Sequence, residues 1–308
     1  MSHRILITGS SGLVGSAVAQ KLTACGVQVV PFDLQANGEA YGDTRDRERL
    51  QNAMERVDGI IHFAAVSRVV WGERDPEQCW ATNVGGIKNI LDINKAWSSS
   101  AWVIFASSRE VYGQPDTLPA TEDSPLRPVN VYGRSKVEGE RLIAEARREG
   151  MNVCTIRLSN VFGTPTDHAD RVVPAFARAA ALGRELRVDG TEQTFDFTHI
   201  DDVSRGIVAL VDRFAAGKPA PPPIHFVSGV PTTLGQLARL AVQIGQSGAT
   251  IRQAAPRDFD VGKFFGDPSR ARELLGWQPQ VRLEEGLARL IHAFRERQNV
   301  TILSEVVG

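Results

Sequence analysis

The fold of this chain is decided near its first residues by the stretch Arg4-Ile5-Leu6-Ile7-Thr8-Gly9-Ser10-Ser11-Gly12-Leu13-Val14-Gly15. The apolar run Arg4–Thr8 predicts a short buried strand, and Leu13–Ala24 has the spacing of a helix. Between them, three glycines allow a tight turn in which backbone N–H groups and the helix dipole face a diphosphate. A glycine triplet is also typical of ordinary glycine-rich connections, so its surroundings must decide.

The next strand supports a nucleotide site. Val27–Phe32 is apolar and β-branched, and it stops at Asp33. In dinucleotide-binding folds an acid about 20 residues after the glycine turn hydrogen-bonds the ribose 2′-hydroxyl. A carboxylate there repels a 2′-phosphate, so the sequence favours NAD over NADP. The alternative for Asp33 is a solvated strand end.

Alternation of strand-like and helix-like segments continues through the first half of the chain. It predicts an α/β fold with a Rossmann-type doubly wound parallel sheet covered on both faces. The further segments expected in this half are helices at Arg45–Arg56, Val84–Trp97 and Val131–Glu149 and strands at Gly59–Ala65, Ala101–Ala106 and Val153–Leu158.

The second half is less regular. Gly217–Pro223 is too rich in proline for a helix or a central strand and predicts a loop. A short strand is expected at Ile224–Val227, and helices are expected at Pro174–Leu182, Asp202–Phe214, Thr233–Ile244, Pro268–Leu275 and Leu283–Arg297.

Composition excludes several classes of protein. Lys plus Arg total 35 and Asp plus Glu 36, a net charge of −1, so no basic excess points to nucleic acid or an anionic membrane. No apolar run approaches a membrane span of about 20 residues, and the first residues show no signal-peptide pattern. The cysteines Cys25, Cys79 and Cys154 lack metal-ligand spacing. We expect free thiols, no metal site and a cytoplasmic location.

A candidate general base opens the long helix. Tyr132 and Lys136 are four residues apart and share one helical face, where an ammonium is expected to lower the pKa of the phenol. Ser108 follows the strand at Ala101–Ala106, at the sheet edge where open α/β folds place their chemistry. A tyrosine and a lysine four residues apart often occur by chance, but their combination with the glycine turn and this serine does not.

These motifs resemble those of extended short-chain dehydrogenases/reductases, in particular the NAD-dependent nucleotide-sugar epimerase/dehydratase branch. The resemblance covers nearly the whole chain. It rests on the glycine turn, His62-Phe63-Ala64-Ala65, Asn83, the SSREVYG run at residues 107–113, Tyr132-x-x-x-Lys136, RLSNVFG at 157–163, DGTEQTFDF at 189–197, Arg257-Asp258, DPSRA at 267–271 and LGWQP at 275–279.

The resemblance implies a role for each matching residue. Residues 1–165 would form the NAD-binding domain, to which later segments return, and 166–308 mainly the smaller nucleotide-sugar-binding α/β domain. Tyr132 would be the base, assisted by Ser108 and tuned by Lys136. The cofactor would contact Gly9, Ser11, Gly12, Leu13, Val14, Gly15, Asp33, Asp43, Thr44, Ala64, Ala65, Tyr132 and Lys136. The substrate would contact Ser108, Arg109, Tyr132, Asn160 and Arg257.

Two departures from the family pattern bear on the substrate. Phe195 stands where the family usually has a phosphate-contacting arginine, and phenylalanine cannot neutralise phosphate. Arg109-Glu110 stands where 4,6-dehydratases often have Asp-Glu. Glu110 therefore keeps a dehydratase-like or decarboxylase-like residue, whereas Arg109 is a poor proton donor. Arg109 could instead pair with a substrate carboxylate, or the two residues could simply pair with each other.

The sequence thus predicts an NAD-dependent nucleotide-sugar 4-epimerase that acts through a 4-keto intermediate on a UDP-hexose or UDP-uronate. A 4,6-dehydratase or uronate decarboxylase using Glu110, a family dehydrogenase/reductase and a non-catalytic NAD-binding protein remain alternatives. The resemblance also suggests a homodimer through helices near Val84–Trp97 and Val131–Glu149. Val66–Trp71 and His168–Arg171 are loops expected near the sugar.

Overall fold

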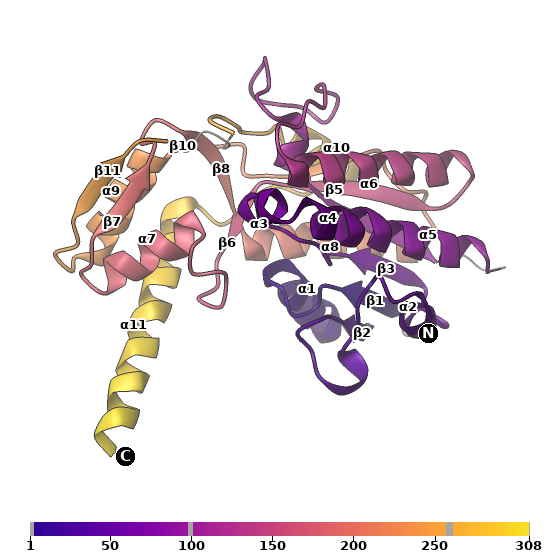
Figure 1. Cartoon of the computed structure of the whole chain (residues 1–308), viewed down its shortest axis with the longest axis horizontal. Helices are drawn as coiled ribbons and strands as arrows, with labels where there is room; N and C mark the ends of the chain where they lie inside the picture. The colour runs from indigo at the N-terminus through magenta and orange to yellow at the C-terminus, as the bar shows by residue number, and fades with distance from the viewer. Residues whose placement is uncertain (1–2, 98–100, 257–260, 308) are drawn as a thin grey trace.

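A six-stranded parallel sheet forms the larger of two lobes (Figure 1). The computed structural model describes residues 3–97, 101–256 and 261–307. The strand order is β2-β1-β3-β4-β5-β9, with bounds β1 Arg4–Thr8, β2 Gln28–Phe32, β3 Gly59–His62, β4 Trp102–Ser108, β5 Val153–Leu158 and β9 Ile224–Phe226. This arrangement confirms the predicted Rossmann-type α/β fold.

Apolar side chains cover both faces of this sheet because successive residues of a strand point to opposite sides. Leu6 and Ile60 belong to one core cluster, whereas Ile5, Ile61 and Ile104 belong to another. The first cluster packs under α2 (Arg47–Ala53), α5 (Gly86–Lys95) and α6 (Val131–Arg148); the second packs under α1 (Leu13–Ala24), α8 (Ile200–Ala215) and α10 (Ser269–Leu275).

The smaller lobe surrounds a core of its own, in which Phe176, Leu237 and Leu287 are buried together. It lies on the left of Figure 1, with α11 running away from it. One sheet has the order β10-β8-β6 and a second pairs β11 with β7. The bounds are β6 Asn160–Phe162, β7 Leu186–Asp189, β8 Thr194–His199, β10 Pro231–Thr233, β11 Ile251–Ala254, α7 Val172–Ala181, α9 Leu234–Gly245 and α11 Leu283–Val307.

Several elements differ from the sequence prediction. The five short strands of the smaller lobe were not expected, and neither were the helices α3 (Val69–Arg74) and α4 (Pro76–Trp80). The helix expected from Val84 begins as a π-helical turn, Ala81–Gly85, before α5. The strand expected at Gly59–Ala65 ends at His62. Short 3-10 turns occupy Gly38–Ala40 and Arg109–Tyr112.

The chain passes between the lobes several times. After β6, β7 and β8 in the smaller lobe it returns to the large sheet through α8 and β9, and β9 pairs with β5. It then visits β10, α9 and β11, returns through α10, and ends in α11. The two lobes are therefore interleaved in sequence.

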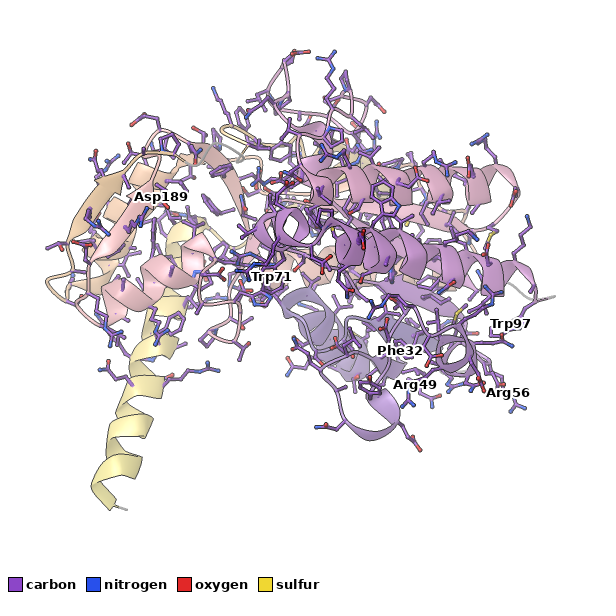
Figure 2. All side chains as sticks on the ribbon, viewed as in Figure 1. Phe32, Arg49, Arg56, Trp71, Trp97 and Asp189 are labelled. Atoms are coloured by element: carbon purple, nitrogen blue, oxygen red, sulfur yellow. The ribbon has the colours of Figure 1, made fainter. Side chains whose placement is uncertain are left out.

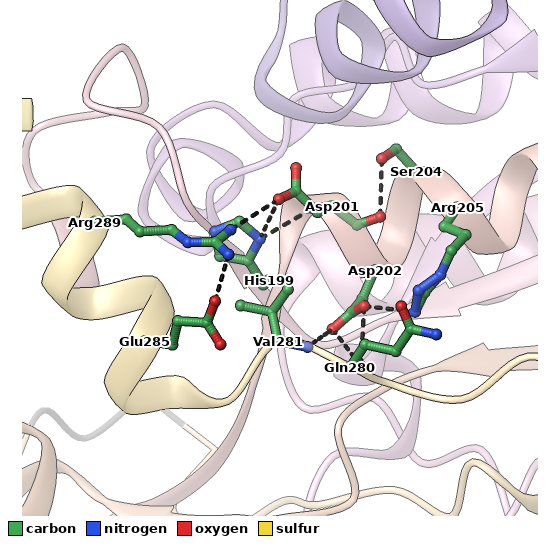
Figure 3. Close-up of polar contacts among 9 residues, drawn as sticks. All are labelled: His199, Asp201, Asp202, Ser204, Arg205, Gln280, Val281, Glu285 and Arg289. Atoms are coloured by element: carbon green, nitrogen blue, oxygen red, sulfur yellow. Dashed lines mark hydrogen bonds and ion pairs between the residues drawn. The ribbon is translucent and has the colours of Figure 1, made fainter. Parts of the chain in front are cut away.

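A buried carboxylate fixes one of these crossings (Figure 3). Asp202, near the start of α8, is 1% exposed and accepts backbone N–H groups from Gln280 at 3.0 Å and Val281 at 2.9 Å. The Arg205 guanidinium contributes a further bond at 2.6 Å. Because residues 280 and 281 lead into α11, this carboxylate holds the last helix against α8.

Within residues 3–97, 101–256 and 261–307, no helix is both long and apolar enough to cross a bilayer. The same residues contain no group of three or more His, Cys, Asp or Glu side chains placed to hold a metal ion. All three cysteines are free thiols, as expected.

Candidate functional site

A cleft of about 650 Å³ brings most of the predicted site residues together. It is lined by the C-terminal ends of the parallel strands and by the facing side of the smaller lobe. The predicted residues that line it are Gly9, Ser11, Gly12, Leu13, Val14, Gly15, Asp33, Asp43, Thr44, Ala64, Ala65, Ser108, Arg109, Glu110, Tyr132, Lys136 and Asn160. Arg257 lies outside the described residues.

The glycine turn is folded too tightly for side chains. A Cβ on Gly15 would stand 2.1 Å from the Gly9 carbonyl oxygen, and one on Gly9 would stand 2.6 Å from the Ala64 nitrogen. Gly9 also has φ +73°, a left-handed conformation that favours glycine. The turn therefore presents bare backbone at the start of α1, as a diphosphate requires.

Two acidic residues, Asp33 and Asp43, line the cleft near the glycine turn. The Asp33 carboxylate accepts N–H bonds from Ser11 at 2.9 Å and Gln35 at 2.7 Å, which places its charge beside the glycine turn. Asp43 is held by the Arg45 guanidinium, whose bond to it lowers the pKa of the acid. Among its described contacts Asp33 has no basic partner, unlike Asp43. Its carboxylate is therefore the one available at the predicted ribose position.

The candidate catalytic residues lie on β4 and α6. Ser108 ends β4, and Tyr132 is the second residue of α6. Lys136 follows one turn later, with its Nζ 5.8 Å from the centre of the Tyr132 ring and 2.8 Å from the Ala106 carbonyl oxygen, to which it donates. Both Tyr132 and Lys136 are buried.

The expected lowering of the Tyr132 pKa is wrong for the protein without ligands. Burial raises the pKa of Tyr132 to about 12, and its bond to the Ser108 hydroxyl only partly opposes this. The sequence argument included the ammonium of Lys136 but could not include the desolvation of the phenol. A further positive charge in the cleft is needed to lower the pKa of Tyr132 toward neutral pH.

Burial of the Lys136 ammonium lowers the stability of the folded protein. Burial lowers its pKa to about 8 from an ordinary value of 10.5. The folded state therefore binds this proton more weakly than the unfolded chain, and the ammonium costs about 3 kcal/mol of stability at pH 7. That cost is complete below pH 8 and fades as the pH rises toward 10.5.

Lys136→Met is accordingly expected to stabilise the ligand-free protein at pH 7, by up to about 3 kcal/mol. The gain should shrink as the pH rises from 8 to 10.5, because the free energy needed to release the lysine proton on folding falls over this range. Urea unfolding of both proteins at pH 7 and pH 10 measures the difference. Lys218→Met, at an exposed position, is the control; a gain at Lys136 that does not change with pH would contradict the argument.

Arg109 and Glu110 occupy the same end of the cleft as Ser108. Glu110 is buried, with Oε1 2.9 Å from an Arg109 Nη and Oε2 accepting from Asn130 Nδ2 at 2.8 Å. Asn130 is the N-cap of α6, since its side-chain oxygen accepts the Gly133 N–H. Both oxygens of Glu110 are therefore engaged, and Glu110 is tied to the helix that carries Tyr132.

A buried network of side chains, which the sequence did not predict, holds α6 against the large sheet. Glu140 on α6 makes two bonds to the Arg157 guanidinium, at 2.9 and 2.6 Å, and accepts the Ser107 hydroxyl at 2.5 Å. Arg157 also donates to the Tyr112 hydroxyl at 2.6 Å. Glu140 thereby links α6, β4 and β5 directly behind the candidate catalytic residues. It gave no sequence signal because it resembles the other charged residues of its helix.

Contacts between the two lobes close one side of the cleft. Arg68 makes paired bonds of 2.8 Å to both oxygens of Asp170. The rings of Trp71 and His168 pack edge to face with their centres 5.0 Å apart, and Figure 2 labels Trp71 where the lobes meet. These residues come from the two loops expected near the sugar, but no local signal could pair Arg68 with a residue 102 positions away.

Asn83 and Asn160, which both belong to the motifs of the family resemblance, have different surroundings. Buried Asn83 bonds both backbone groups of Val66 and donates to Ser135 Oγ, so it supports the structure. Asn160 begins β6 and lines the cleft, with its amide 3.4 Å from the Asp196 carbonyl oxygen. Phe195 also lines the cleft, beside Arg109.

Comparisons with known proteins bear on the family and the fold of this chain. Residues 5–226 match the family described as the NAD dependent epimerase/dehydratase family. A UDP-glucose 4-epimerase of Mycolicibacterium smegmatis is 32% identical over 321 residues, covering 96% of this chain and 99% of that protein. A UDP-glucuronic acid decarboxylase 1 of Xenopus tropicalis is 32% identical over 312 residues, covering 95% of this chain and 72% of that protein.

A solved structure shares the whole architecture. It is a UDP-glucose 4-epimerase of the hyperthermophile Thermotoga maritima, crystallised with UDP-glucose. Its sequence is 28% identical, the TM-score is 0.88, and the match covers 96% of this chain and 99% of that one. The match includes the smaller lobe, whose strands the sequence did not predict.

Proposed function

Since this chain belongs to the NAD-dependent epimerase/dehydratase family, we propose that it is a nucleotide-sugar 4-epimerase that acts through a 4-keto intermediate on a UDP-hexose or UDP-uronate. The family resemblance drawn from the sequence is thereby confirmed, and NAD is the cofactor of the family. The observation that carries the proposal is the meeting of Ser108, Tyr132 and Lys136 with the glycine turn in one cleft.

The cleft fits NAD by its own geometry. The tight turn at Gly9 and Gly15, where a Cβ would collide with the protein's own backbone, brings the start of α1 to the cleft, where it could hold a diphosphate. The Asp33 carboxylate, which lies beside the glycine turn, would bind the adenosine ribose, and Lys136, which lies beside Tyr132, would bind the second ribose. When bound, NAD supplies a hydride acceptor and a positively charged ring.

In the proposed mechanism, Tyr132 removes the proton of the sugar C4 hydroxyl, and Ser108 orients that hydroxyl. The C4 hydride would pass to the ring that NAD supplies, and the sugar would become a 4-keto sugar. The Tyr132 phenolate would be favoured by the positive charge of that ring, against the burial that raises the Tyr132 pKa. The keto sugar would then turn over in the cleft, the hydride would return to the opposite face of C4, and Tyr132 would give the proton back.

Glu110 favours an epimerase over a dehydratase. Elimination of water needs a free base for the C5 proton and an acid for the leaving hydroxyl. Glu110 has both oxygens engaged by Arg109 and Asn130, and Arg109 is a poor acid. A uronate decarboxylase is the second candidate, because it needs only the 4-keto acid, and because a decarboxylase is among the relatives.

The test is an assay of the purified protein with NAD and a panel of UDP-glucose, UDP-glucuronate, GDP-mannose and dTDP-glucose. Product mass and NMR are measured. An unchanged mass with inverted C4 is the expected result. Loss of water or of carbon dioxide would replace the epimerase by a dehydratase or a decarboxylase, and NADH accumulation with simple alcohols alone would overturn the nucleotide-sugar proposal.

A further inference from the structure

Arg109 has a buried charge that is only partly paired. One Nη lies 2.9 Å from Glu110 Oε1, and its side chain is 13% exposed. The guanidinium carbon lies 4.6 Å from the centre of the Phe195 ring, which covers one face of the cation. The other terminal nitrogen, Nη1, is buried with no hydrogen-bond partner among the residues that the structure describes.

A buried N–H donor without an acceptor is unfavourable unless a ligand supplies the acceptor. Arginine keeps its charge at any ordinary pH, so it cannot relieve the loss of water by releasing a proton. Other arginines that line the cleft have carboxylate partners: Arg68 pairs with Asp170, Arg171 with Asp167 and Arg187 with Asp189. Among the described cleft residues, Arg109 is the arginine with a buried donor that lacks an acceptor.

The position of the Arg109 guanidinium in the cleft indicates which part of the substrate it would contact. Arg109 directly follows Ser108, and its partner Glu110 is bonded to Asn130, two residues before Tyr132. In the proposed function Ser108 and Tyr132 hold the C4 hydroxyl. In a pyranose ring C4 adjoins C5 and its C6 substituent, whereas C1, which carries the diphosphate, lies on the opposite side of the ring. The guanidinium is therefore tethered on the C4 side.

We propose that Arg109 binds the C6 carboxylate of a nucleotide-activated uronic acid, an inference that rests on the proposed function. A carboxylate is planar and offers two acceptors to the guanidinium fork, including Nη1. A hydroxymethyl group offers one neutral oxygen and makes a weaker, single bond to the Nη1 donor. Phe195 excludes water from one face, which strengthens a charged bond formed there.

The test compares binding of UDP-glucuronate, UDP-glucose and UDP to the NAD-loaded protein by titration calorimetry. Arg109→Gln is expected to weaken UDP-glucuronate binding by about 10- to 100-fold, the usual range for one charged hydrogen bond. UDP-glucose and UDP should change by less than about threefold. Arg109→Lys, which keeps the charge but loses the fork, should lie between.

The control is Arg141→Gln, because Arg141 is an exposed arginine of α6 outside the cleft. It should leave all three affinities unchanged. If Arg109→Gln weakens UDP as much as UDP-glucuronate, Arg109 binds the diphosphate and the inference is wrong. If no affinity changes, Arg109 serves only to hold Glu110, and the inference is again wrong.

Failure of the proposed function has a different signature. A wild-type protein that binds neither UDP nor either UDP-sugar would overturn the proposed UDP-sugar substrate and this inference with it. A wild-type protein that binds UDP but does not prefer UDP-glucuronate to UDP-glucose would overturn the carboxylate inference alone.

Discussion

Tyr132→Phe should reduce kcat by about 1,000-fold or more while NAD still binds. The substitution removes one oxygen from a buried side chain and leaves its ring in place. In the proposed mechanism that oxygen moves the C4 proton in both half-reactions, and such a general base typically contributes 10²- to 10⁴-fold. Steady-state turnover of the nucleotide sugar and fluorescence titration of NAD measure the two effects separately.

Tyr112→Phe is the matched control. Tyr112 is also buried, and its hydroxyl bonds Arg157 and His225 rather than lining the catalytic end of the cleft. This variant should lose stability with little loss of kcat. Equal losses of kcat in the two variants would show that buried hydroxyls in general, and not Tyr132, limit turnover. Full turnover by Tyr132→Phe would refute Tyr132 as the base, whereas NAD binding without turnover in both wild type and variant would favour a non-catalytic NAD-binding protein.

Arg157→Met should cost about 3–5 kcal/mol of unfolding free energy, the typical loss when one partner of a buried ion pair is removed. The substitution leaves the Glu140 carboxylate buried, with only Ser107 bonded to it among the contacts described. Urea unfolding monitored by tryptophan fluorescence gives the value. Activity should fall as well, because Glu140 joins α6 to β4 behind Ser108 and Lys136.

The double variant Glu140→Met/Arg157→Met separates the pair from the packing. It should be more stable than Arg157→Met alone, since no charge is then left buried without its partner. Arg141→Met, which removes the ion pairs of an exposed arginine with Glu138 and Glu145 on the same helix, should change stability by less than about 1 kcal/mol. A double variant less stable than the single one would refute the explanation.

The features predicted correctly from sequence are those with a local cause. The turn at Gly9 and Gly15 and the apolar strands on either side of it depend on residues close together in the chain. The same is true of the Tyr132–Lys136 spacing, which a single helix fixes. The predicted cofactor residues consequently gather in one cleft.

The features that were missed depend on residues distant in sequence. The strands β6 to β8 are three to six residues long, too short for a hydrophobic period to identify, and they are stabilised by partners such as β10. The bond between Arg68 and Asp170 and that between Glu140 and Arg157 have no local signature. The Tyr132 pKa was misjudged for the same reason, because burial is a property of the whole fold.

The repeated crossing of the chain between the lobes has a consequence for how such proteins can be altered by recombination. A single crossover after residue 165 would exchange the smaller lobe but would also replace α8 and β9, which complete the nucleotide-binding sheet. A hybrid gene that keeps the parental sheet must instead be spliced at several points, around the segments that return. New substrate preferences are therefore more accessible to this architecture by changing single residues in the cleft, such as Arg109, than by exchanging whole modules.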